Sequence, residues 1–402
     1  MTIPAVQVKE LKIGNEYPVR IMGVINLSPE SFYKGSIAIN NEQVIELVRT
    51  YEIEGADIID VGAASSSPLN VYSRKMTSVE EEYKRVSEFL SVIVESTSLP
   101  VSIDTTSAEV AEKALNLGAA VVNDISGLRA DKRMGTIITE YSVPVILMAN
   151  CKNACDSVQK SLNALRNSLN TANNAGIEDD RIIVDPGIGF GKLTEADIRL
   201  LQKLRAFKAF EKPVLVGISR KAFLGEILEL PNPDDRLLGT IAATTICVTN
   251  GANVIRTHDV KEALVASKIG QRLRRKNIKS NDLIELYHIQ DYEESEAILE
   301  QIGVSPKIKS SLAQKSIILN VVLRNLKIPA ALIIKQEMLA LGGDAAYHHD
   351  TIDFGVDSTD VLIMGTRIQL KRLCHKMKTM DYFRLDKISD SILGLLDEHG
   401  EL

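Results

Sequence analysis

The feature that most constrains the fold is a regular alternation of short apolar runs with helical patterns along the first two thirds of the chain. The runs are rich in β-branched residues and show no polar face, which is typical of strands buried on both sides. They are Val19 to Asn26, Asp57 to Val61, Pro100 to Asp104, Ala119 to Asp124, Pro144 to Met148, Arg181 to Asp185, Pro213 to Ile218 and Ala252 to Arg256.

Helical patterning fills most of the gaps, and Gly55 and Gly118 end two of these helices just before the next strand. Strand and helix alternating eight times over roughly 250 residues predict an α/β fold of the (β/α)₈ TIM-barrel type. An open, doubly wound sheet is the alternative, but no Gly-x-Gly-x-x-Gly motif follows the first strand.

The sixth run leads into a loop that is nearly bare of side chains, Ile182 to Lys192. The strand stops at Asp185, proline then ends the pairing, and three glycines in five residues allow a flat ligand to approach closely. Phe190 is the only large side chain in this loop. The stretch is consistent with a binding site, although Asp185 and the glycines could equally serve only to form a turn.

Polar side chains stand at the carboxyl ends of all eight runs, where barrel enzymes place their chemistry. Singly, each has a structural explanation, such as a helix cap or a satisfied core histidine, but together they predict an active site because buried polar groups are costly. They are Asn26, Asp60, Asp104, Asn123, Asp124, Asn150, Asp185, Ser219, Arg220, Lys221, Arg256, Thr257 and His258, and the apolar Met148 stands with Asn150 at the end of the fifth run.

These residues divide by chemistry into two groups. Asp104, Asn123, Asp185 and Lys221 offer acceptors and donors suited to a flat heterocycle with an amino-keto edge. Asn26, Arg256 and His258 suit a phosphate, which barrels often bind near the last strand.

The same residues resemble the dihydropteroate synthase family, in the form that carries an added C-terminal domain. The resemblance spans roughly Val19 to Gln271 and rests on separated segments in the family's order. They are Ile21 to Phe32, Gly55 to Gly62, Ser102 to Thr105, Asn123 to Gly127, Leu147-Met148, Asp185 to Lys192, Gly217 to Lys221, Leu238 to Thr240 and Arg256 to Val260.

The resemblance implies a transferase that joins a dihydropterin-methyl diphosphate to an arylamine and releases diphosphate, in folate or related pterin C1-carrier biosynthesis. It implies catalytic roles for Asp104, Asp185 and Lys221, and a pterin pocket formed by these three residues with Asn123 and Met148. Asn26, Arg256 and His258 are expected to hold the diphosphate, with Asn26 as the protein ligand of Mg²⁺. Phe190 and Arg220 are expected on the arylamine side. Pairing of barrels through outer helices implies a homodimer.

The departures from the family pattern lie on the arylamine side. Ser65-Ser66-Ser67-Pro68 stands where the family usually has Ser-Thr-Arg-Pro, so Ser66 and Ser67 replace the usual acceptor contacts. Lys34 stands at a usual Asp, and Ala64 at a usual Glu. Two acceptors therefore stay open: p-aminobenzoate, with Arg220 or Lys34 as its cation, or a bulkier aminobenzene bearing a ribosyl phosphate.

Two other readings of the barrel remain. One is a methyltransferase that binds a reduced, methylated pterin and donates to a corrinoid protein, but such a protein has no diphosphate for Arg256 and His258 to hold. The other is a pterin-binding subunit without catalysis.

Net charge, apolar runs and cysteine count restrict the partners and the cellular compartment of the protein. A net charge of −6 argues against a nucleic-acid partner, and no apolar run reaches the roughly 18 residues that span a membrane. Four cysteines in 402 residues, with no signal peptide at the start, predict a reducing cytoplasm rather than a disulfide framework. Cys151 and Cys155 have metal-ligand spacing, but no second pair completes a site.

The chain is expected to divide into a pterin-binding barrel, residues 1–277, and a small α+β domain of unknown role, residues 283–402, joined by a basic linker. Strands are predicted at Ile317 to Leu323, Thr351 to Val356 and Asp360 to Gly365, and helices at Ala330 to Leu341 and Arg367 to Lys378. His348-His349-Asp350 could bind a metal, but neighbouring side chains of an extended segment diverge, which favours a solvated loop.

Overall fold

The computed structural model describes residues 5–28, 40–64, 77–151, 155–190, 192–274, 278–281, 284–286 and 289–401. The chain forms two compact units, residues 1–287 and 288–402, a boundary a few residues beyond the one expected from the sequence. Lys34, Ser66 and Ser67 lie outside the described residues.

The first unit is a closed barrel of parallel strands in the order β8-β7-β6-β5-β4-β3-β10-β9. A parallel bridge between Val184 and Val214 joins the two ends of this order and closes the barrel. The strands are β3 (Arg20–Asn26), β4 (Ile58–Gly62), β5 (Val101–Asp104), β6 (Val121–Asp124), β7 (Val145–Met148), β8 (Ile182–Asp185), β9 (Leu215–Gly217) and β10 (Val254–Thr257). The predicted (β/α)₈ fold is therefore confirmed.

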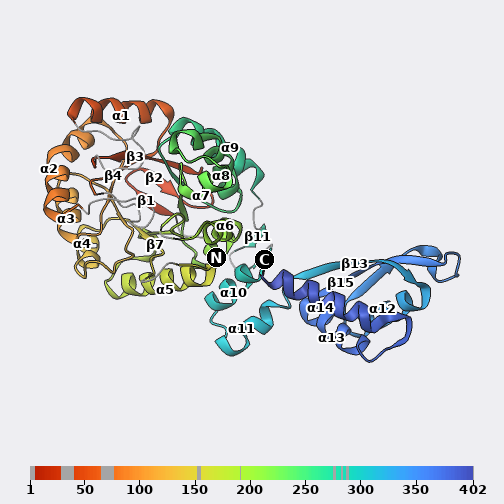
Figure 1. Cartoon of the computed structure of the whole chain (residues 1–402). Coiled ribbons are helices and arrows are strands. Elements are labelled where there is room, and N and C mark those ends of the chain that lie inside the picture. Colours follow the sequence, from red (N-terminus) through yellow and green to blue (C-terminus); the bar gives the residue numbers. More distant parts are fainter. Residues whose placement is uncertain are drawn as a thin grey trace. The chain divides into compact units, whose positions relative to one another are not determined.

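Helices surround this sheet (Figure 1). Gly55 ends α1 in the left-handed conformation, φ 94°, as predicted from its position before β4. Ser78 caps α2 through the N–H of Glu81 at 3.2 Å, and three glutamates follow in the first turn. The helices are α1 (Asn41–Glu54), α2 (Val79–Ser96), α3 (Ala108–Asn116), α4 (Met134–Tyr141), α5 (Val158–Asn174), α6 (Thr194–Gln202), α7 (Ala222–Ile227), α8 (Leu237–Thr249) and α9 (Val260–Leu273).

A hairpin that the sequence did not predict closes the amino-terminal end of the barrel. Its strands, β1 (Val6–Val8) and β2 (Leu11–Ile13), are too short to show a clear alternation. Val6, Val8 and Ile13 are at most 1% exposed. They pack against inward-facing residues of the barrel strands, namely Met22, Ile58, Val121, Ile146, Ile183, Leu215 and Val254.

The second unit is α+β. Its antiparallel sheet has the order β13-β15-β14, from β13 (Ile318–Lys327), β14 (Asp344–Tyr347) and β15 (Ser358–Thr366). Three helices, α12 (Ile328–Ala340), α13 (Arg367–Met377) and α14 (Leu385–Glu401), supply the core that packs on alternate residues of β15. Before them come α10 (Tyr292–Gln301) and α11 (Pro306–Ala313).

Three expectations for this part of the chain are wrong. Thr351 to Val356 is not a strand, because a 3₁₀ turn over His349–Thr351 precedes it; the missing strand is β14. Part of the expected linker instead pairs as β11 (Ile278–Asn281) and β12 (Ile284–Leu286). The same 3₁₀ turn brings the side chains of His348, His349 and Asp350 together, with ligand atoms within 4.8 Å of one another, so they do not diverge.

The cysteine expectation also needs correction. Cys151 and Cys155 form a disulfide with Cα atoms 5.5 Å apart, whereas Cys247 and Cys374 are free and buried. This bridge closes a single short loop, so it links no two helices or strands, yet it removes the argument for a reducing compartment.

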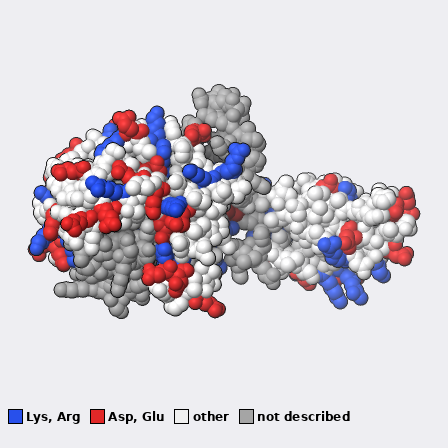
Figure 2. Space-filling model, turned by 90° about the horizontal axis from the view of Figure 1, so that it is seen from above, with Lys and Arg blue, Asp and Glu red and all other residues white. Residues whose placement is uncertain are grey.

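Among the described residues, no helix is both long and apolar enough to cross a bilayer. On the face drawn in Figure 2, acidic and basic side chains are mixed over the barrel.

Candidate active site

Polar side chains enter the barrel at the carboxyl ends of its strands. Ile58 and Ile183 face inward within the apolar cluster, and strand side chains alternate, so Asp60 and Asp185 point into the barrel as well. The same step of two residues places Asn123, Met148 and Arg256 inside. The interior therefore changes from apolar to polar within one alternation of each strand.

Arg256 spans this polar end. Its Nε donates to Asp60 Oδ2 at 2.6 Å and its Nη2 donates to Asp104 Oδ2 at 2.9 Å. Asn123 donates to the same Asp60 oxygen at 3.3 Å. The sequence separated Arg256 from the heterocycle group, but the structure joins the two groups through its guanidinium.

Burial dominates the electrostatics around this arginine. It raises the pKa of Asp104 to about 7 against the opposing charge of Arg256, and neighbouring Asp60 and Glu82 raise it further. Burial alone would lower the pKa of Arg256, but the two carboxylates outweigh that effect and raise it. Asp60 Oδ1 is buried and has no hydrogen-bond partner within the described ranges. An unsatisfied buried acceptor beside a cation is the kind of group that a ligand or an ordered water completes.

Asp185 and Lys221 form the second part of the polar end. Burial raises the pKa of Asp185, opposed by the N–H of Gly187 at 2.7 Å and by the charge of Lys221. Burial lowers the pKa of Lys221 to about 8, opposed by Asp185 and Asp197. The Lys221 ammonium donates to the carbonyl oxygen of Ile188 and lies 4.2 Å from the ring centroid of Phe190.

The glycine-rich loop is shaped by this pairing. Gly187 and Gly189 have φ of 71° and 77°, a conformation that favours glycine. A Cβ on Gly187 would stand 2.8 Å from the carbonyl oxygen of Ala149, and one on Gly189 would overlap the Lys221 stem. The glycines are thus required by the packing of Lys221 and the neighbouring strand, in addition to any ligand.

Two charged residues of the site were not identified from the sequence. Lys192 donates to the carbonyl oxygen of Gly187, and Asp197 accepts from Gly189 N at 2.7 Å. Burial lowers the pKa of Lys192 and raises that of Asp197. Asp197 stands in the first turn of α6, where an acidic residue usually indicates only a favourable interaction with the helix dipole, so its sequence position did not point to the site. Asp60 differs from these two residues, because its place near the end of β4 did indicate a position at the site.

His258 and Asn26, the other residues expected at the diphosphate, stand at the carboxyl ends of β10 and β3 at this end of the barrel. His258 Nδ1 is 3.0 Å from Ser219 Oγ, and burial lowers the pKa of His258 to about 3, helped by the charges of Arg256, Arg220 and Lys221. The imidazole is therefore neutral and can serve as a donor or an acceptor. A Cβ on Gly62 would lie 3.6 Å from Asn26 Oδ1 and 4.0 Å from Asp104 Cβ, which places the amide beside the carboxylates.

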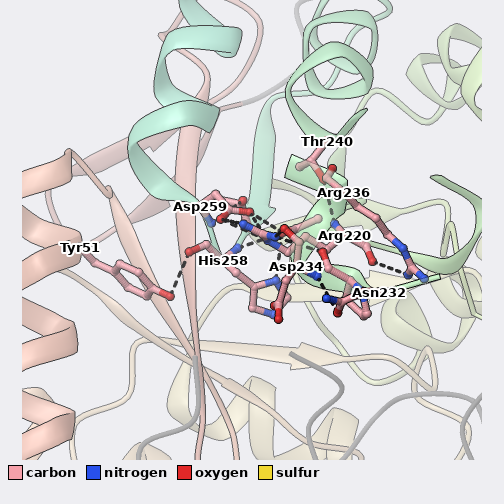
Figure 3. Close-up of polar contacts among 11 residues, drawn as sticks. Tyr51, Arg220, Asn232, Asp234, Arg236, Thr240, His258 and Asp259 are labelled. Atoms are coloured by element: carbon pink, nitrogen blue, oxygen red, sulfur yellow. Dashed lines mark hydrogen bonds and ion pairs between the residues drawn. The ribbon is translucent and has the colours of Figure 1, made fainter. Parts of the chain in front are cut away.

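Arg220 belongs to a buried network, shown in Figure 3, that includes Asp259 and adjoins His258. It is 5% exposed, and its guanidinium donates to both carboxylate oxygens of Asp259, at 2.9 and 2.7 Å. Nη1 donates to the carbonyl oxygens of Pro233 and Asp234 at 3.0 and 2.7 Å. These partners direct Arg220 toward Asp259 and the segment between α7 and α8, so the geometry does not favour the expected role as an arylamine cation.

A closed (β/α)₈ barrel with ionisable residues converging at its carboxyl end defines a class of enzyme that binds a small polar ligand inside the barrel. The family model described as pterin binding enzyme matches residues 22–258, and the chain belongs to this family. That match includes no part of the C-terminal unit.

Individual relatives are consistent with the match to the pterin binding family. The chain is 39% identical to a dihydropteroate synthase of Clostridium beijerinckii over 65% of this chain and 96% of the relative, and 34% identical to that of Bacillus subtilis over 62% and 86%. A solved dihydropteroate synthase of Thermus thermophilus, in complex with 6HMPPP, is 33% identical and covers 67% of this chain and 99% of its own, with a TM-score of 0.57.

Proposed function

We propose that this chain is a dihydropteroate synthase-type transferase, which joins a dihydropterin-methyl diphosphate to an arylamine and releases diphosphate, in folate or related C1-carrier biosynthesis. The observation that carries the proposal is the position of Arg256. Its side chain contacts Asp60 and Asp104 on the side expected to hold the pterin, and its charge acts on His258, which is expected to hold the diphosphate. A barrel that transfers a methyl group would have no leaving diphosphate for this guanidinium to bind.

The residues of the chain suit the chemistry. Asp185, with Asn123, would accept hydrogen bonds from the amino and ring N–H groups of the pterin, and protonated Lys221 would donate to a ring acceptor. When the bond between the methylene carbon and the diphosphate oxygen breaks, positive charge spreads into the pterin. The carboxylates of Asp104 and Asp185 lower the energy of that charge. The arylamine nitrogen then forms the new C–N bond, and its proton passes to the released diphosphate.

Mg²⁺ belongs to the proposal as a companion of the diphosphate. The side-chain oxygen of Asn26 at the end of β3 is a hard, neutral ligand of the kind that Mg²⁺ accepts, and diphosphate oxygens and water would supply the remaining ligands. When bound, the ion would neutralise the leaving group.

The test combines turnover and binding. Purified protein with dihydropterin-methyl diphosphate, Mg²⁺ and p-aminobenzoate should release diphosphate, and calorimetry should detect binding of diphosphate that strengthens with Mg²⁺. Pterin binding without any effect of diphosphate supports methyl transfer instead. Binding of both ligands without turnover of any arylamine supports a non-catalytic subunit.

The acceptor is proposed to be p-aminobenzoate. With Arg220 paired to Asp259, Lys34 is the remaining cation of the two considered from the sequence. Introducing the family's arginine by Ser67→Arg should raise kcat/KM for p-aminobenzoate roughly 10- to 150-fold, which corresponds to the about 1.5–3 kcal/mol of a charged hydrogen bond. It should disfavour an aminobenzene bearing a ribosyl phosphate. If the ratio of kcat/KM for the two acceptors is the same in the variant and the parent, this account of the missing arginine is refuted.

A homodimer completes the proposal, together with a cytoplasmic location, which is supported by the similarity to bacterial dihydropteroate synthases and no longer by the cysteines. Sedimentation of the full chain tests the dimer, and a monomer at micromolar concentration would exclude it.

A further inference from the structure

The C-terminal unit contains a cavity of about 830 Å³ between the end of β13 and the start of α14. Four basic residues line it, Arg324, Lys327, Arg384 and Lys387, against one carboxylate, Asp381. This positive lining belongs to a chain whose net charge is −6. Positively charged side chains therefore gather at this cavity although the chain as a whole is negatively charged. Such a local positive potential favours a negatively charged ligand.

Among the side chains that the structure describes, three of the four cations have no carboxylate partner to neutralise them. Arg324 pairs with Asp360 at 2.6 Å. For Lys327, Arg384 and Lys387, no carboxylate lies within 4.0 Å among residues 289–397, where side chains are described. Solvated cations that share one cavity repel each other, and an anion bound between them removes that repulsion.

The backbone on both sides of the cavity departs from regular strand and helix geometry, with a β-bulge on one side and positive φ angles on both. On β13, Arg324 and Asn325 stand opposite Asp360 alone, a β-bulge in which Asn325 has φ 54°. On the other side, Phe383 and Arg384 have φ of 55° and 62° just before α14. Non-glycine residues in this conformation are uncommon, and they gather where function requires a particular direction of side chains.

Two helix N-termini strengthen the positive potential. Lys327 is the N-cap residue of α12 and makes no side-chain capping hydrogen bond, and Arg384 directly precedes α14. Both helices are long enough, with 13 and 17 residues, to place a partial positive charge at these ends. The termini support the cations rather than defining a site alone.

The cavity also has apolar surface. Val322 and Phe383 remain 46% and 42% exposed there, and Ile388 lies beside them. Its volume lies within the roughly 300–1,000 Å³ of small-molecule sites. We propose that this cavity binds a phosphorylated small molecule with a planar ring, of the nucleotide class. The phosphates lie among Lys327, Arg384 and Lys387, and the ring packs on Phe383 and Val322.

The experiment uses the full chain and titrates ATP, AMP, inorganic triphosphate and adenosine by calorimetry. ATP is expected to bind most tightly, triphosphate and AMP more weakly, and adenosine least, since both charge and ring contribute. The double variant Arg384→Gln, Lys387→Gln should weaken ATP by roughly a hundredfold, about tenfold for each charged contact. Phe383→Ala should weaken ATP but not triphosphate.

Two controls place the binding. Lys371→Gln with Arg372→Gln removes two cations from α13, which does not line this cavity, and should leave ATP affinity unchanged. Arg256→Gln, in the barrel, should also leave it unchanged. Loss of ATP binding in Arg256→Gln, equal loss in the α13 variant, or equally tight binding of citrate would overturn the proposal. Lys327→Gln provides a second test if the double variant does not fold.

Discussion

The two ends of the barrel interior are built from the same strands and differ completely in chemistry. At the amino-terminal end, inward side chains are aliphatic, and the β1–β2 hairpin covers them. At the carboxyl end, two residues further along, the strands place carboxylates, amides and a guanidinium. One end buries apolar area, which stabilises the fold, while the other buries charges, which costs stability.

The pKa shifts express this difference. Burial raises the pKa of Asp104 and Asp185 and lowers that of Lys221 and His258. The charged form of each group is therefore less stable in the barrel than in water. A fold that accepts this cost keeps groups ready to exchange their partners for those of a ligand. The hydrophobic end supplies the stability that makes such an arrangement tolerable.

The largest expected effect comes from removing a charge at the polar end. Asp185→Asn should lower kcat/KM by roughly 10³-fold, about 4 kcal/mol, because the amide no longer accepts two hydrogen bonds from the pterin. Since the pKa of Asp185 is raised in the fold, its ionised form destabilises the protein at neutral pH. The variant should therefore be at least as stable in urea denaturation as the parent. A less stable variant would show that Asp185 serves the fold.

The opposite result is expected at the apolar end. Ile183→Ala, on the same strand, should lower the free energy of unfolding by about 2–5 kcal/mol through the cavity it leaves. At a temperature well below unfolding, kcat/KM should change less than twofold. Val265→Ala, 59% exposed on α9, is the matched control and should leave the stability unchanged. A large loss of activity in Ile183→Ala would mean that the two ends are coupled.

A pH titration separates stability from activity at one residue. With the pKa of Lys221 at about 8 in the fold and an ordinary value of 10.5, the unfolded chain binds more protons between these values. Stability should therefore rise as pH increases through this window, while activity falls about tenfold per pH unit because the ammonium is lost. Lys221→Arg should remove the alkaline fall from whatever activity remains. Parallel changes in activity and stability would contradict the assignment.

The smallest effect tests the buried network of Arg220. Thr240 accepts from Arg220 N at 2.9 Å and donates to the carbonyl oxygen of Arg236 at 3.0 Å. Thr240→Val keeps the volume and should cost about 1 kcal/mol in free energy of unfolding, with little change in kcat/KM. Thr50→Val, on an exposed face of α1, should cost less than about 0.5 kcal/mol.

Much of the barrel could be predicted because its signals are local. Each buried parallel strand is a short apolar run, and most of the strands end at or beside a polar residue, so the order of elements and the positions of Asp104, Asn123 and Asp185 follow from the sequence. The hairpin, β14 and the turn at His349 could not be predicted, because short strands and 3₁₀ turns depend on the surfaces against which they pack.

The sequence by itself determined the barrel and the residues at its strand ends, since alternation and strand length are properties of neighbouring residues. Only the tertiary structure decided which of these residues meet. It joined Arg256 of the last strand to Asp60 and Asp104, paired Arg220 with Asp259, and placed Lys192 and Asp197 around the glycine loop. The contacts of Arg256 and Arg220 link residues distant in the chain, which the closed barrel brings within hydrogen-bonding distance. Lys192 and Asp197 are close in the chain to their glycine partners, and the conformation of the loop places them.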